Sequence, residues 1–180
     1  MKHTINQILS ILIAAAFFTS CSNDITLQRY FVNNQESKNF ISQDLPLSMI
    51  ELDKTNFTEE QKEAYNSVKK LNILGYKINE KDVETFNTEL ETVKTILSHD
   101  KYNDLIEFSD RGNKVHVKYI GTDEEADEVV VLGIAKDTGF GIVRVLGDDM
   151  SPEKMVTLID VLQKANIDES QLQDIMNFFK

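Results

Sequence analysis

Residues 102–146, YNDLIEFSDRGNKVHVKYIGTDEEADEVVVLGIAKDTGFGIVRVL, decide the fold of this chain. From Tyr102 onward, apolar residues recur mostly at every second position, which is the period of a β-strand. The stretch predicts four strands, at 102–108, 114–120, 128–135 and 140–146. Glycine lies in the loops that join the first pair and the last pair, which favours hairpins. We therefore predict an antiparallel meander.

The second of these strands indicates how the sheet is exposed. Val115, Val117 and Tyr119 point one way, and Lys114, His116 and Lys118 point the other. One face of an antiparallel sheet commonly packs on the core while the other meets water. We expect the face with the two lysines and His116 to meet water.

Along the chain, helices are predicted both before and after the meander. Thr58 to Gln61 form a capping box, and Ala64, Tyr65, Val68 and Leu71 then share one helical face. A strand follows at 74–78, and a second helix, capped by Asn79, has the apolar stripe Val83, Phe86, Leu90, Val93 and Leu97. After 147–149, Ser151 and Pro152 start a helix, and a last amphipathic helix contains Leu172, Ile175, Met176 and Phe179.

This order of elements predicts an α+β domain, with helices packed on one face of a mostly antiparallel sheet. The domain is expected to span 40–180, and the polar segment 21–39 is expected to be a tether that ends in a short helix or strand. Segment 40–52 contains Pro46, so a strand there should be an edge strand or end at that proline. A chain of this length forms one core.

The first 20 residues resemble a bacterial lipoprotein signal. Lys2 is followed by an apolar run, Ile8 to Phe18, which is too short to cross a bilayer as a helix. Phe18-Thr19-Ser20-Cys21 resembles a lipobox, in which the cysteine receives fatty acyl chains such as palmitate and becomes the new N-terminus. Two or three acyl chains anchor a protein stably. Ser22 resembles the residue that directs such lipoproteins to the outer membrane, facing the periplasm or the outside.

The alternative is an ordinary secretory signal, in which case Cys21 is a leftover thiol. If Cys21 is lipidated, the mature chain has no thiol for a disulfide, a zinc site or a nucleophile. The formal net charge of −11 falls by one more unit when the signal is removed, because the signal contains Lys2 and no acidic residue. Because a protein with this negative charge is repelled by nucleic acid phosphates, we expect no nucleic acid partner.

Few residues suggest chemistry, and we expect no cofactor and no metal. Asp148 and Asp149 lie between a strand and a helix, where they could bind a metal or act as acid and base, or simply shape a turn. His116 lies between two lysines, which disfavour its protonation. The acidic run from Asp123 to Glu128 lacks the spacing of a calcium loop and is better explained as a solvated hairpin.

A family resemblance combines several of these features. The lipobox, Tyr102-x-x-Leu105-Ile106, Gly112-x-x-Val115-x-Val117 and Leu146-Gly147-Asp148 together resemble a family of small Gram-negative envelope lipoproteins. That family is catalogued as domain of unknown function 4252. The resemblance implies an outer-membrane lipoprotein, sometimes linked to the envelope response, and supplies no catalytic residues.

Two functions therefore stay open. The first is a non-enzymatic binding or accessory module that is held at the membrane by its lipid and contacts an envelope protein partner. The second is a metal-dependent or acid–base hydrolase centred on Asp148 and Asp149, with His116 as a further candidate. We expect the first, because the sequence shows no convergent set of titratable groups.

Overall fold

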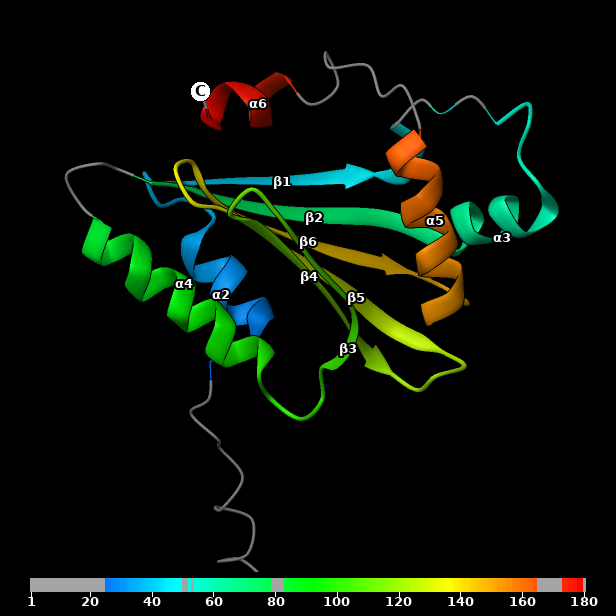
Figure 1. Cartoon of the computed structure of the whole chain (residues 1–180), viewed down its shortest axis with the longest axis horizontal. Coiled ribbons are helices and arrows are strands. Elements are labelled where there is room, and N and C mark those ends of the chain that lie inside the picture. The colour runs from blue at the N-terminus through cyan, green and yellow to red at the C-terminus, as the bar shows by residue number, and fades with distance from the viewer. Residues whose placement is uncertain (1–24, 50–51, 53, 79–82, 165–172, 180) are drawn as a thin grey trace, which may run out of the picture.

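The computed structural model describes residues 25–49, 52, 54–78, 83–164 and 173–179. The centre of this described part is a six-stranded sheet with the strand order β1-β2-β6-β5-β4-β3 (Figure 1). All neighbouring strands in it are antiparallel. The strands are β1 (Phe40–Pro46), β2 (Val68–Lys77), β3 (Asn103–Asp110), β4 (Asn113–Gly121), β5 (Ala126–Ala135) and β6 (Gly139–Gly147). The α+β class and the meander from β3 to β6 are confirmed.

The hairpin between β3 and β4 is tighter than the sequence suggested. Asp110 pairs with Asn113, so only Arg111 and Gly112 form the loop. Both have positive φ angles, 49° and 90°. A two-residue loop with positive φ at both positions matches the right-handed twist of the flanking strands, and glycine adopts this conformation at little cost.

Helix α3 (Glu59–Ser67) begins as predicted and ends earlier than predicted. The Thr58 hydroxyl accepts from the backbone N–H of Gln61 at 3.2 Å, and the Gln61 side chain accepts from the backbone N–H of Thr58 at 3.0 Å. The predicted apolar stripe ran on to Leu71, but Val68 already has an extended conformation and pairs with Gly147 of β6. The local pattern placed Val68 in a helix, but the backbone of this β-branched residue forms strand hydrogen bonds with β6 instead.

Helix α4 (Val83–Leu97) buries Phe86, Leu90, Val93 and Leu97 of the predicted stripe, and Ile96 with them. Val83, the first residue of the helix, was predicted in the stripe but is 48% exposed. It packs beside α2 (Leu27–Asn34), whose Leu27, Tyr30 and Phe31 are buried in the same core. Segment 21–39 therefore does end in a short helix, but this helix belongs to the folded domain. The Tyr30 hydroxyl donates to Glu89 of α4 at 2.6 Å, and burial raises the pKa of Tyr30. The Asn79 cap lies outside the described residues.

The helices divide between the two faces of the sheet, which differs from the prediction. Helices α2 and α4 pack on Leu74, Leu132 and Ile142, and we call this side the α4 face. Helices α3 and α5 (Pro152–Lys164) pack on the other side, the α5 face, against Val129 and Val145. Figure 1 shows the two pairs at opposite ends of the strands.

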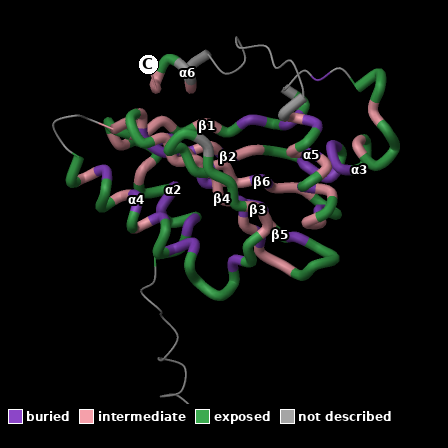
Figure 2. The backbone as a smooth tube through the Cα atoms, in the orientation of Figure 1, coloured by how far each residue is buried: buried purple, intermediate pink, exposed green. Residues whose placement is uncertain are grey.

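The reason for two covered faces lies in the central strands. Strands β5 and β6 have mostly apolar residues on both sides, so helices that cover either side bury apolar surface. His116 and Lys118, predicted to meet water, are half-buried on the α4 face, because they pair with Leu132 and Val130. In Figure 2, buried segments concentrate in the sheet and on the inner sides of the helices.

The structure confirms the predicted edge strand in 40–52 and the predicted helix start at Ser151. Strand β1 lies at the sheet edge and ends at Pro46, and the short turn η1 (Leu47–Met49) follows it. The Ser151 hydroxyl accepts from the backbone N–H of Lys154 at 3.2 Å, and Pro152 is the first residue of α5. Helix α6 (Gln173–Phe179) lies next to β2.

Candidate functional site

The two candidate aspartates lie in an exposed turn between β6 and α5. Asp148 forms an ion pair with Lys69, and the Asp149 carboxylate accepts from the Lys154 ammonium at 2.6 Å. Their side chains are 76% and 92% exposed. Asp149 has a φ of 55°, which is typical of a turn residue. Each carboxylate therefore has its own lysine, and both are surrounded by water.

His116 is not part of that turn. It pairs with Leu132, which pairs with Ile142, and Ile142 comes six residues before Asp148 in β6. At about 3.3 Å per residue, that separation is about 20 Å along the strand. The carboxylate of Glu107 lies beside His116, with Nδ1 and Oε2 3.7 Å apart. The structure thus does not bring the three candidate residues together, and Cys21 lies outside the described residues.

A largely buried ion pair is the main charged feature of the sheet. The Arg144 guanidinium donates to both oxygens of Glu128, at 2.6 and 2.9 Å, and the two side chains are 13% and 14% exposed. The Phe31 ring lies 5.5 Å from Arg144 Cζ. The hydrogen bond to Glu128 raises the pKa of Arg144. Burial, helped by the charge of Glu128, raises the pKa of Tyr102 to about 12.

This pair belongs to a polar row across the α4 face. The row runs in register through Asp44, Asn72, Arg144, Val130, Lys118 and Asp104. Asn72 donates to Asp44, and Lys118 pairs with Asp104 at 2.6 Å. Because the charges in the row already have partners, it offers no group poised for catalysis.

A groove runs along the outer side of α4. Its volume is about 1020 Å³, and it is lined by residues at the start of the described chain and by one side of the helix, among them Ile25, Thr88, Thr92, Thr95 and His99. The Thr88 and Thr92 hydroxyls donate to helix carbonyls at 3.0 and 2.9 Å. The groove therefore presents threonine methyl groups beside polar side chains such as Asn87, Glu91 and Lys101.

Part of the α5 face is apolar and only partly covered, and its Val115, Val131 and Val143 lie at the edge of the core under α3 and α5. Ile73, Val143 and Val131 lie side by side there, and each is only partly buried. Phe108, further along the same face, is 46% exposed. We call this surface, with Ile41 and Val115, the open apolar half. Solvated sheet faces are normally polar, so this apolar surface is the candidate site of the domain.

Three glycines form the floor of this surface. Gly75, Gly141 and Gly133 pair across β2, β6 and β5, so they lie in one row between Ile41 on one side and Val115 on the other. Among the described residues, a Cβ atom added at Gly141 would meet nothing within 4 Å, and one at Gly133 would meet the Gly141 carbonyl at 3.9 Å. We call these three residues the glycine row.

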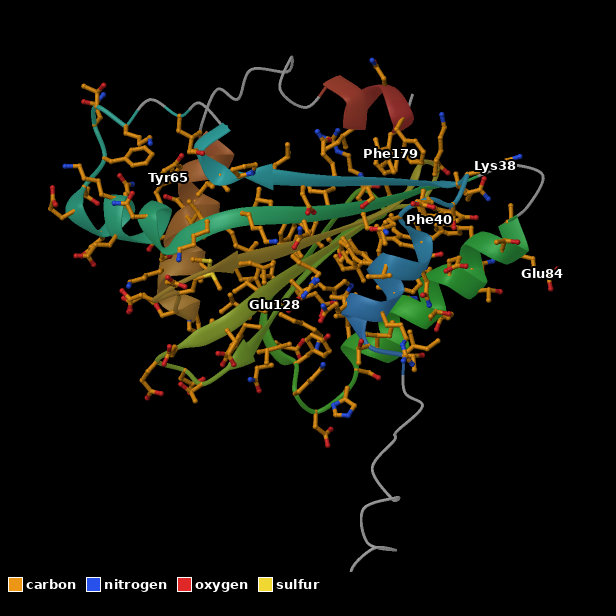
Figure 3. All side chains as sticks on the ribbon, turned by 180° about the vertical axis from the view of Figure 1, so that it is seen from behind. Lys38, Phe40, Tyr65, Glu84, Glu128 and Phe179 are labelled. Atoms are coloured by element: carbon orange, nitrogen blue, oxygen red, sulfur yellow. The ribbon has the colours of Figure 1, made fainter. Side chains whose placement is uncertain are left out.

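One end of the glycine row is occupied. A Cβ atom added at Gly75 would lie 2.8 Å from the Phe179 ring, which means that the ring rests directly on the backbone of β2. Figure 3 shows Phe179 reaching from α6 toward the sheet. Phe178 stacks edge-on against Phe179, with ring centroids 5.2 Å apart. The side chain of Phe179 thus fills the space that Gly75 leaves.

Comparison with known proteins identifies the domain. Residues 30–158 match the family described as Domain of unknown function (DUF4252). The chain belongs to this family. Neither a curated protein nor a solved structure matches it. The DUF4252 match covers all six strands and ends before α6, so the sheet with its glycine row belongs to the family domain. None of the helices that the structure describes is long and apolar enough for a membrane span.

The sequence contains signals for the ion pair and for the glycine row. Glu128 and Arg144 are charged residues inside two mostly apolar strands, which indicates a paired charge in the core. Gly75, Gly133 and Gly141 are glycines inside strands, where glycine weakens a sheet unless another group approaches closely. Each was visible alone, but their alignment depends on the register of three strands.

Proposed function

We propose that this protein is a lipid-anchored protein of the outer membrane that acts as a non-enzymatic binding module. Its binding surface is the open apolar half of the α5 face. The observation that supports this most strongly is that Ile73, Val131, Val143 and the exposed Phe108 form one apolar surface beside the glycine row. Such a surface costs solubility when it is left bare, so a partner that covers it explains its presence.

The anchor would keep this surface near the membrane. Leu27 is 2% exposed in the core and follows Cys21 by six residues. A chain extends by at most about 3.5 Å per residue, so a lipid on Cys21 holds the start of α2 within about 20 Å of the bilayer. A partner in the same membrane or in the adjacent compartment is then at high local concentration.

The binding role is tested with the lipidated full chain in membranes. The double variant Phe108→Ser, Val131→Thr makes the open apolar half more polar and keeps a β-branched residue in β5. We expect cross-linking followed by affinity purification to recover an envelope protein with the wild type, and several-fold less of it with this variant. The matched control is Val32→Ser, Val156→Ser, which replaces two exposed valines, 59% and 43% exposed, outside this surface. Equal recovery with both variants contradicts the proposal.

The anchor is tested separately by Cys21→Ser. We expect this variant to leave the membrane fraction or to accumulate as an uncleaved precursor, because no acyl chain can attach. Mature-sized protein that still floats with membranes contradicts lipidation at Cys21. For the alternative hydrolase, no observation on the described residues supports Asp148 and Asp149 as a reactive pair, since each pairs with a lysine.

A further inference from the structure

We propose that the glycine row takes an aromatic side chain from a short amphipathic helical segment of a partner protein, and that α6 is the intramolecular competitor for this position. The inference rests on the proposed binding role of the open apolar half. It adds the chemistry of the partner and a device that controls access.

The contact of Phe179 with Gly75 is the first argument. The ring lies where a methyl group at residue 75 would be, and a Cβ there would also lie 3.0 Å from Ile41 Cγ2. A glycine inside a strand loses side-chain packing and conformational entropy. Close approach of a flat ring to the backbone is a physical use for that glycine.

The second argument is that the row continues past Phe179. Gly141 and Gly133 follow Gly75 in register, each about 4.8 Å further across the sheet. Space at Gly141 is open, and the row ends at Val115 and the exposed Phe108. The floor is therefore about 10 Å longer than the part on which Phe179 lies. A second aromatic side chain fits the part that α6 leaves open.

The third argument concerns the rest of the occupant. Segment 173–179, QDIMNFF, is a helix with an acidic residue near its start and two phenylalanines at its end. Lys77 lies two residues beyond Gly75, so its side chain is on the same face. Its ammonium is suited to an acidic residue in the same helical segment as the aromatic one. The chain's own C-terminal helix thus shows the composition that this surface accepts.

The experiment uses the full chain and a labelled peptide of residues 171–180, QLQDIMNFFK, as the probe. Wild type should bind it weakly, because Phe179 already occupies the Gly75 end of the row. Phe179→Ala should lower the dissociation constant by about tenfold or more, since removal of a competitor raises the competent fraction. A peptide with alanine in place of its last phenylalanine should lose this binding.

A second variant shows where the peptide binds. Gly141→Val, added to Phe179→Ala, places an isopropyl group in the open space beside Gly75, and valine favours a strand. We expect it to abolish peptide binding while the circular dichroism spectrum and the unfolding midpoint stay close to those of Phe179→Ala. Val32→Ser, on α2, is the matched control and should leave binding unchanged.

Several results would overturn the proposal. Equal affinity of wild type and Phe179→Ala means that α6 does not compete, and unchanged binding in Gly141→Val means that the glycine row is not the site. If Phe179→Ala instead forms a dimer and ignores the peptide, a second copy is the occupant. If palmitate displaces the peptide, an acyl chain is the occupant. Loss of peptide binding with intact capture of the membrane partner would refute this inference and leave the proposed function standing.

Discussion

Replacing Arg144 with methionine should destabilise the domain strongly, because it leaves the Glu128 carboxylate buried without its partner. The two side chains are 13% and 14% exposed, and the guanidinium donates to both carboxylate oxygens. Breaking a buried pair by removing one partner costs about 3–5 kcal/mol. We expect about 3–4 kcal/mol here, since the remaining exposure lets some water reach Glu128. That is a large part of the about 5–15 kcal/mol that holds a domain folded.

The assay is urea unfolding followed by circular dichroism. With an m-value of about 2 kcal/mol/M, a loss of 3–4 kcal/mol lowers the midpoint by about 1.5–2 M. The double variant Glu128→Leu, Arg144→Met should regain most of this, because two apolar residues of similar size need no charge partner. Asp148→Asn is the control: its ion pair with Lys69 is 76% and 64% exposed and should contribute less than about 1 kcal/mol.

Two results would refute this reasoning. A cost below about 1 kcal/mol for Arg144→Met would mean that the pair is solvated. A double variant as unstable as the single one would mean that Arg144 acts through another contact, such as the Phe31 ring at 5.5 Å.

Three further predictions concern the core, the alkaline limit and metals. Leu90→Ala should lower the free energy of unfolding by about 2–5 kcal/mol in denaturant unfolding, because Leu90 of α4 is only 8% exposed. A loss below about 0.5 kcal/mol would mean that Leu90 faces water. Because the pKa of Tyr102 is raised to about 12 in the fold and is about 10 when unfolded, its contribution to stability is complete below pH 10 and disappears as pH rises from about 10 to 12. Tyr102→Phe should flatten that decline in an unfolding series, and an unchanged slope would contradict it. Millimolar calcium, magnesium or zinc should leave the unfolding midpoint unchanged, and a shift that disappears in Asp148→Asn, Asp149→Asn would make a metal site the leading hypothesis.

Local signals in the chain predicted local structure well. The capping box at Thr58 and the start of α5 at Pro152 involve residues only a few positions apart, so their geometry depends little on the rest of the fold. The same holds for the period of two in β4 and for the stripe of α4. These patterns were enough to predict the α+β class and the antiparallel meander.

The end of α3 shows where local reasoning failed. Ala64 to Leu71 have helical periodicity, yet Val68 joins the sheet because Gly147, far away in the chain, offers its backbone for pairing. The prediction that all helices pack on one face of the sheet was wrong for a related reason. An apolar stripe predicts that a helix is buried, but it does not determine which side of a sheet receives it.

The candidate surface was the least predictable feature. Gly75, Gly133 and Gly141 come from three strands, and they form a row only because the register of β2, β6 and β5 aligns them. Arg144 and Glu128 likewise meet across two strands. The sequence by itself determined the class of the fold, the periods of its elements and the stop signals between them, because these arise from interactions over a few residues. Only the tertiary structure decided which faces the helices cover and which glycines stay bare, because both depend on backbone pairing between residues far apart in the chain.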